Sequence, residues 1–137
     1  MSTINRWVDG SYWFASERNV ANIRLEDLKV LQIVDLLKGE KTSYDTGPCD
    51  SFDDGKGNLW YGTWGLGLYR FEPRSGLVRN FRSSGQLTDL MIKSDDCISI
   101  LGVNDSSLWI AAREDGLLRF DVRTNRLTGK WVSSKSY

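Results

Sequence analysis

The sequence contains no histidine, and this absence excludes more function classes than any other feature of its composition. Without histidine the chain cannot form a Ser-His-Asp triad or a Cys-His nucleophile pair. The zinc sites that depend on imidazole ligands are excluded for the same reason. Enzymatic functions that rest on histidine are therefore not expected here.

Neither charge sign is in excess, and no long apolar run is present. Lys and Arg together number 18, as do Asp and Glu, so no net field attracts the chain to nucleic acid or to an anionic membrane. No stretch of about 18 consecutive apolar residues occurs, which predicts no direct membrane insertion. No signal peptide is visible at the start, so we expect the chain either to stay where it is made or to derive from a larger secreted or anchored parent.

One segment of the chain occurs almost twice. Residues 59–63 and 67–72 read LWYGT and GLYRFE, and residues 108–112 and 116–121 read LWIAA and GLLRFD. Trp60 and Trp109 are 49 positions apart, and Arg70 and Arg119 are separated by the same distance. A period of about 40–50 residues, with short strands and Gly-rich turns, is typical of β-propeller blades.

A fainter copy precedes these two. Trp13 lies 47 positions before Trp60, and Arg24 lies 46 positions before Arg70, which predicts a one-residue insertion between the halves of this copy. Residues 25–37 carry apolar residues at a helix-like spacing, but we interpret them as the third and fourth strands of this blade because their register follows the repeat.

The repeats predict an all-β fold of about three four-stranded antiparallel blades, an incomplete propeller unless the chain is oligomeric. We place blade one at about residues 1–45, blade two at 46–93 and blade three at 94–137. The strands expected in the second blade are 49–52, 59–64, 68–72 and 77–82, and those in the third are 97–103, 108–113, 117–122 and 127–132. The polar segments 38–48 and 83–96 are expected to link the blades.

The motifs of the second repeat resemble the two-component regulator propeller repeat. Residues 54–63, DGKGNLWYGT, and 67–72, GLYRFE, match the pattern of that family nearly throughout, whereas the third repeat has Ser106-Ser107 for Gly-Asn and Ala111-Ala112 for Gly-Thr. The resemblance implies the sensor propeller of bacterial hybrid histidine kinases, which recognises glycan breakdown products. It further implies a periplasmic location if the chain is part of such a sensor, although no kinase, receiver or membrane segment is present here.

The repeated tryptophans and arginines are interpreted as structural. We expect Trp13, Trp60 and Trp109 to pack between blades. The repeated arginines Arg24, Arg70 and Arg119 have two possible roles: a structural bridge to an acidic residue or to loop carbonyls, or a cationic contact to an acidic sugar.

Cys49 and Cys97 lie 48 positions apart, at similar places in adjacent repeats. Buried small residues are favoured there over a disulfide, because equivalent positions of adjacent blades rarely approach to about 6 Å. The acidic residues Asp50, Asp53 and Asp54 do not fit a calcium loop and are expected to form a solvated turn. We therefore expect neither a metal nor another cofactor.

Trp64 is the residue best placed for ligand contact. Its counterpart in the third repeat is Arg113, and both precede Gly-containing turns, where loops of several blades converge. Trp64 offers a plane that can stack on a sugar ring, and Arg113 and Glu114 offer charged hydrogen bonds to hydroxyl groups or a carboxylate. The alternative is that Trp64 is only a half-buried loop aromatic.

These observations favour a non-enzymatic ligand-sensing or interaction module, with an oligosaccharide ligand implied by the resemblance alone. One alternative is a purely structural or oligomerisation segment, and another is a propeller glycoside hydrolase, for which no convergent acid pair is visible. The expected partners are an oligosaccharide and either a second copy of the chain or the remainder of a larger propeller.

Overall fold

The computed structural model describes residues 2–42, 46–85, 92–104 and 106–132. Within these residues the chain forms twelve strands and no α-helix. The strands are β1 (Ser2–Arg6), β2 (Tyr12–Ser16), β3 (Asn19–Arg24), β4 (Lys29–Asp35), β5 (Gly47–Asp53), β6 (Leu59–Trp64), β7 (Leu68–Glu72), β8 (Leu77–Phe81), β9 (Cys97–Gly102), β10 (Ser107–Ala112), β11 (Gly116–Asp121) and β12 (Arg126–Trp131).

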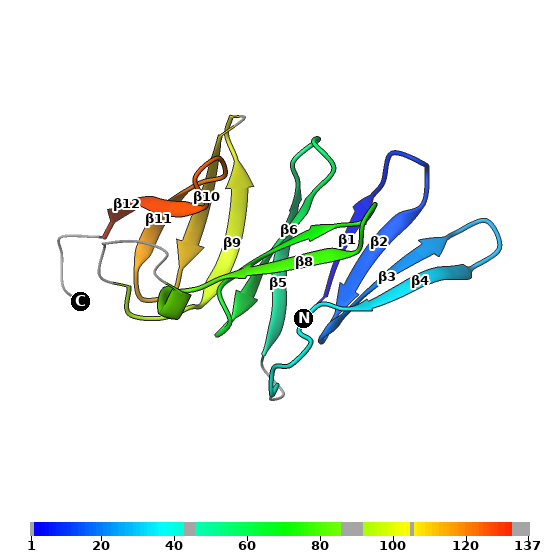
Figure 1. The fold of residues 1–137 in the computed structure, drawn as a ribbon, viewed down its shortest axis with the longest axis horizontal. Helices are drawn as coiled ribbons and strands as arrows, with labels where there is room; N and C mark the ends of the chain where they lie inside the picture. The colour runs from blue at the N-terminus through cyan, green and yellow to red at the C-terminus, as the bar shows by residue number, and fades with distance from the viewer. Residues whose placement is uncertain (1, 43–45, 86–91, 105, 133–137) are drawn as a thin grey trace.

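The strands form three antiparallel sheets of four strands each, and every sheet is contiguous in the sequence. Blade 1 is β1-β2-β3-β4, blade 2 is β5-β6-β7-β8 and blade 3 is β9-β10-β11-β12. The all-β fold of blade-like sheets predicted from the repeats is confirmed. Figure 1 shows the three blades side by side in chain order, with blade 2 between the others.

The first strand of each blade lies innermost. β5 contacts both β1 and β9, so the three sheets radiate from their first strands as propeller blades do. Polar groups join these inner strands: Asp50 Oδ2 accepts hydrogen bonds from the Ile100 backbone N–H at 2.9 Å and from Ser99 Oγ at 3.1 Å. The hydroxyl groups of Thr3 and Ser51 make a similar contact between blades 1 and 2.

Apolar side chains fill the two spaces between blades. Trp13 of blade 1 packs edge-on against Phe71 of blade 2, with ring centroids 4.9 Å apart. Trp60 of blade 2 packs against Phe120 of blade 3 at 5.6 Å, again edge to face. Both tryptophans are almost fully buried, so the prediction that they pack between blades is confirmed. Trp109 differs, because the face of blade 3 on which it lies meets no further blade of the described chain.

The register of the first repeat corrects one sequence-based expectation. Trp60 pairs across the sheet with Arg70, and Trp109 pairs with Arg119, but Trp13 pairs with Asn22. Arg24 therefore does not correspond to Arg70, and its guanidinium forms an exposed ion pair with Asp27 at 2.8 Å instead.

The predicted one-residue insertion is wrong for a simple reason. Only residues 17–18 connect β2 to β3, whereas residues 65–67 and 113–115 make the corresponding turns in the other blades. The first repeat is thus one residue shorter at this turn. Residues 25–37 form strand rather than helix, as expected, but only β4 lies within them, because β3 has already ended at Arg24.

The repeated arginines stack on aromatic rings. Arg70 Cζ lies 5.6 Å from the Trp60 ring and 5.7 Å from the Phe81 ring, and Arg119 lies 5.9 Å from Trp109 and 5.5 Å from Trp131. Neither arginine forms an ion pair within the described residues. Both make structural hydrogen bonds beside the cation–π contact. Arg70 donates to Asn125 Oδ1 at 3.3 Å, and Arg119 donates to Thr128 Oγ1 at 3.0 Å and to the Thr128 carbonyl at 3.4 Å, so only the acidic partner of the expected bridge is missing among the described residues.

Both cysteines are free thiols. Cys97 is buried, and burial raises its pKa to about 12, so the thiol stays protonated at neutral pH. Burial also raises the pKa of the half-buried Cys49. Neither thiol is activated as a nucleophile.

Candidate functional site

The candidate site lies at one end of the blades. Because neighbouring strands are antiparallel, the turn from the second to the third strand of each blade lies at the same end as the links between blades. We call this end the link end. It holds the turns at residues 17–18, 65–67 and 113–115 and the described parts of the links after β4 and β8.

The turn after β6 is held in place by hydrogen bonds around Thr63. The Thr63 hydroxyl donates to the Gly67 carbonyl at 2.6 Å and accepts from the Leu66 N–H at 3.2 Å. Gly67 has a φ of 77°, and an added Cβ there would collide with the carbonyl oxygen of Phe81. The Thr and Gly of this motif therefore fix the turn that directly follows Trp64.

Trp64 and Arg113 meet across the boundary between blades 2 and 3. The Arg113 Cζ atom lies 5.1 Å from the centroid of the Trp64 ring. Trp64 is half-buried and Arg113 is exposed, and the Arg113 backbone N–H donates to the Asp96 carbonyl at 3.2 Å. The structure thus brings together two of the three residues proposed from the sequence, and it places them as a stacked pair rather than as separate contacts.

Glu114 lies in the same turn as Arg113. Its side chain is exposed and has no hydrogen bond or ion pair among the described residues. The structure therefore places it at the link end without bringing it onto the stacked pair.

Asp115 anchors this turn, a role that the sequence analysis missed. Its fully buried carboxylate accepts hydrogen bonds from the backbone N–H groups of Lys93 at 2.8 Å and Ser94 at 3.1 Å, and from Lys130 Nζ at 2.9 Å. Burial would raise the pKa of Asp115, but these hydrogen bonds outweigh it and hold the pKa below its ordinary value. An Asp directly before a turn glycine was the only sequence signal for this role.

A groove lies between the outer strands of blades 1 and 2. It encloses about 680 Å³, within the usual range for small-ligand sites. The sequence analysis did not find it, because its walls come from two repeats. Its lining combines apolar and polar side chains: Ile33, Val34, Asp35, Leu36, Lys38, Glu40, Tyr69, Val78 and Asn80, with Gly76.

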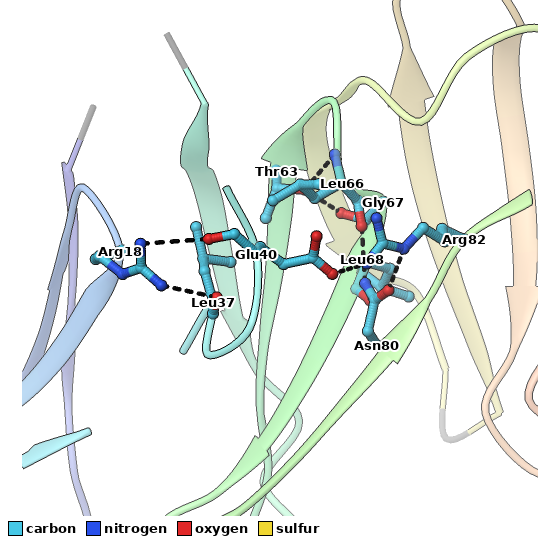
Figure 2. Close-up of polar contacts among 9 residues, drawn as sticks. All are labelled: Arg18, Leu37, Glu40, Thr63, Leu66, Gly67, Leu68, Asn80 and Arg82. Carbon is cyan, nitrogen blue, oxygen red and sulfur yellow. Dashed lines mark hydrogen bonds and ion pairs between the residues drawn. The ribbon is translucent and has the colours of Figure 1, made fainter. Parts of the chain in front are cut away.

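Arginines compensate both carboxylates of this groove. Arg18 holds Asp35 through two hydrogen bonds of 3.0 and 3.2 Å and also donates to the Leu37 carbonyl at 3.0 Å. Arg82 pairs with Glu40 and donates to Asn80 Oδ1 at 2.6 Å. Figure 2 shows this chain of contacts from Arg18 through Glu40 to Arg82.

One further hydrogen bond and one buried phenol belong to the groove wall. The Asn80 amide donates to the Leu66 carbonyl at 2.7 Å, which joins β8 to the turn after β6 (Figure 2). Burial is the main cause that raises the pKa of Tyr69; the nearby Arg82 opposes this change, while Glu40 and Asp35 add to it. The Tyr69 phenol therefore stays neutral across the ordinary pH range.

The described residues contain no cluster of three or more metal-ligating side chains that could hold an ion. They also contain no helix long and apolar enough to cross a membrane.

Comparison with solved structures identifies similar folds. The extracellular domain of the hybrid two-component system BT3049 from B. thetaiotaomicron superposes with a TM-score of 0.70 at 21% identity, over 94% of this chain and 16% of that domain. The extracellular domain of BT4673 from the same organism gives 0.68 at 15% identity, over 91% and 17%. Saccharomyces cerevisiae Sqt1 gives 0.68 at 13% identity, over 93% and 34%.

The chain thus spans about a sixth of the two bacterial domains. At these identities the similarity shows the fold alone, that of blade-like propeller fragments. Two of these three neighbours are extracellular domains of hybrid two-component systems. No protein-family model and no curated protein sequence matches the chain.

Proposed function

We propose that the chain is a non-enzymatic ligand-sensing or interaction module, and that its ligand is an oligosaccharide bound at the link end by Trp64, Arg113 and Glu114. The extracellular sensor domains among its structural neighbours support the sensing role. They also support a location outside the cytoplasm, which would be the periplasm for a sensor of this kind. The oligosaccharide is taken from the resemblance of the repeat, and the link end offers side chains that suit such a ligand.

The observation that carries the proposal is the stacked pair of Trp64 and Arg113. Stacking on the indole orients the guanidinium, so that its N–H groups are directed at fixed angles toward a hydroxyl or a carboxylate. The second face of the indole can stack on the apolar face of a sugar ring, and the exposed Glu114 can accept hydrogen bonds from hydroxyl groups. An aromatic plane beside charged hydrogen-bonding groups is a typical arrangement for binding a sugar.

Isothermal titration calorimetry tests this proposal, with an oligogalacturonate as an acidic probe and a maltooligosaccharide as a neutral one. We expect saturable binding of at least one probe. Trp64→Ala should weaken it by about 1–3 kcal/mol, or about 5–150-fold, while the melting temperature changes little. Loss of stability comparable with that of a core tryptophan variant would place Trp64 in the core and contradict the site.

Tyr69→Phe is the matched control for location, because it removes one hydroxyl from the groove between blades 1 and 2 and leaves the ring. We expect this variant to bind as tightly as the wild type. Binding that depends on Tyr69 but not on Trp64 would place the ligand in the groove instead.

A second candidate function is a purely structural or oligomerisation segment. The exposed apolar side chains on the outer faces of blades 1 and 3 favour it, since such faces usually meet another protein surface. It predicts no saturable binding by either probe. Release of new reducing ends from a probe would instead indicate a glycoside hydrolase, although Asp35 and Glu40 are each paired with an arginine.

A further inference from the structure

The outer face of blade 3 repeats a surface that the chain buries elsewhere. The ring centroids of Trp109 and Trp131 lie 5.3 Å apart, and Arg119 stacks over both rings. Arg70 stacks over Trp60 and Phe81 in the same way in blade 2. In blade 2 the tryptophan of this arrangement is 1% exposed. In blade 3 the corresponding face leaves Trp131 49%, Leu101 60% and Leu117 41% exposed.

The structure shows twice what covers such a face. The opposite face of the next blade covers it in both cases: Leu59, Tyr61 and Phe71 lie over Trp13, and Leu108, Ile110 and Phe120 lie over Trp60. Each covering surface is built from the second and third strands and is apolar. A face of this kind is therefore the expected cover for Trp109.

Blade 1 has the corresponding face, and no blade of the described chain precedes it. The cross-strand pairs place Ile4, Phe14 and Ala21 in one row opposite to the buried side of the sheet, and Ile33 continues that row. Ile4 is 60% and Ile33 65% exposed. Phe14 corresponds in register to Tyr61 and Ile110, which are two of the covering residues in the other blades.

We propose that the Trp109 face of blade 3 docks onto the Phe14 face of blade 1 in a second copy of this chain. The two copies bind head to tail, each supplying the face that the other lacks, and six blades close into a ring within the usual propeller range of about 4–8 blades. The chain carries both halves of this contact in equal number, which an unrelated partner would not need to do.

The inner strands carry different side chains on the open faces than between blades 2 and 3. Between blades 2 and 3 the Phe52 ring lies against Gly102, where an added Cβ would collide with it. On the open faces Leu101 occupies the position of Phe52, and Arg6 that of Gly102. In the docked pair Leu101 therefore faces Arg6 in place of the Phe52–Gly102 contact.

Sedimentation velocity tests the proposal with two charge variants, Leu101→Lys on blade 3 and Ile4→Glu on blade 1. The wild-type chain should sediment as a particle of twice 15.6 kDa. Each variant alone should dissociate into single copies, with a dissociation constant raised at least tenfold. Leu77→Lys, at a residue that is 58% exposed on the outer strand of the middle blade, should leave the mass unchanged.

An equal mixture of the two charge variants identifies the head-to-tail arrangement. In the mixed dimer one contact pairs the two introduced charges and the other contact is wild-type, so the mixture should regain the dimer mass. A wild-type chain that stays single at every concentration overturns the proposal, as expected if the blades of a longer propeller cover these faces. A dimer that only Leu101→Lys disrupts overturns it in favour of blade 3 against blade 3. Circular dichroism must show that each variant keeps its sheets.

Discussion

Blades 2 and 3 place the same tryptophan and arginine motif in two different surroundings. In blade 2, Trp60 stacks on Phe81 at 6.0 Å, is covered by Phe120 of blade 3 and donates its indole N–H to Asp54 Oδ2 at 3.0 Å. In blade 3, Trp109 has Trp131 as its aromatic neighbour and Arg119 over its ring, but no blade of the described chain covers it.

The comparison separates two contributions to the stability of a propeller blade. The stack of ring and guanidinium forms within one blade, whether or not a neighbour is present. Burial of the ring depends on the next blade, and burial is the larger energetic contribution for an aromatic side chain. The covered and the open faces should therefore respond differently to the same substitution.

Truncation of the tryptophan should produce the largest difference between the two faces. Trp60→Ala should lower the free energy of unfolding by about 3–5 kcal/mol, because it leaves a cavity between two blades. Trp109→Ala should cost only about 1–2 kcal/mol at a protein concentration low enough to keep single copies apart. Urea denaturation measures both, and equal losses would show that Trp109 is as well packed as Trp60.

Filling two glycine positions should produce a smaller difference. Gly102→Ala inserts a methyl group against the Phe52 ring between two blades, and we expect a loss of about 1–3 kcal/mol in unfolding free energy. Gly129→Ala inserts one against the Trp131 ring, which is half exposed and can turn outward, so the loss should stay below about 1 kcal/mol. Thermal denaturation of the two variants checks the order, which should be reversed if the Trp131 ring is held rigidly.

The smallest expected effect concerns pH. Burial would raise the pKa of Asp54, but hydrogen bonds from the Trp60 indole, Asn58 and the Lys56 backbone outweigh it and hold the pKa below its ordinary value. Asp54 therefore stabilises the fold above about pH 4, and this contribution is lost as the pH falls through its lowered pKa. Asp54→Asn should cost about 1 kcal/mol at pH 7 and almost nothing near pH 2.

Asn104 provides the control for this pH effect. It anchors the corresponding turn of blade 3 through the backbone N–H groups of Ser106 at 2.9 Å and Ser107 at 3.0 Å, and it cannot titrate. The stability lost in Asn104→Ala should be the same at both pH values. A pH-independent cost for Asp54→Asn would contradict the assigned role of the carboxylate.

The sequence predicted those features that the repeat itself encodes. The bounds of β6 and β7 agree with the predicted strands, because glycine-containing turns of characteristic chemistry flank both. The sequence places the counterparts Trp64 and Arg113 at one site from their positions alone. In the structure the Arg113 Cζ atom lies 5.1 Å from the centroid of the Trp64 ring. A clear repeat therefore predicts neighbours in adjacent blades, since equivalent residues lie at equivalent heights.

Other features could not be predicted because they depend on departures from the repeat. The first copy has lost most of its glycines, so the shorter turn at residues 17–18 left no signal, and Arg24 was aligned in place of Asn22. The groove depends on Arg18 and Glu40, which lie in a turn and a link that the repeat pattern does not constrain. The contacts that long side chains make from one blade to the next can be identified only in the packed structure.

The most direct test is the melting temperature of the wild-type chain, measured as a function of protein concentration. It shows whether the three blades of one chain need a second copy to cover their open faces. If the open faces of blades 1 and 3 dock onto each other, binding stabilises the folded state and the melting temperature rises steadily with concentration. Leu101→Lys should abolish this rise. A wild-type melting temperature that is the same across a hundredfold range of concentration would contradict the account.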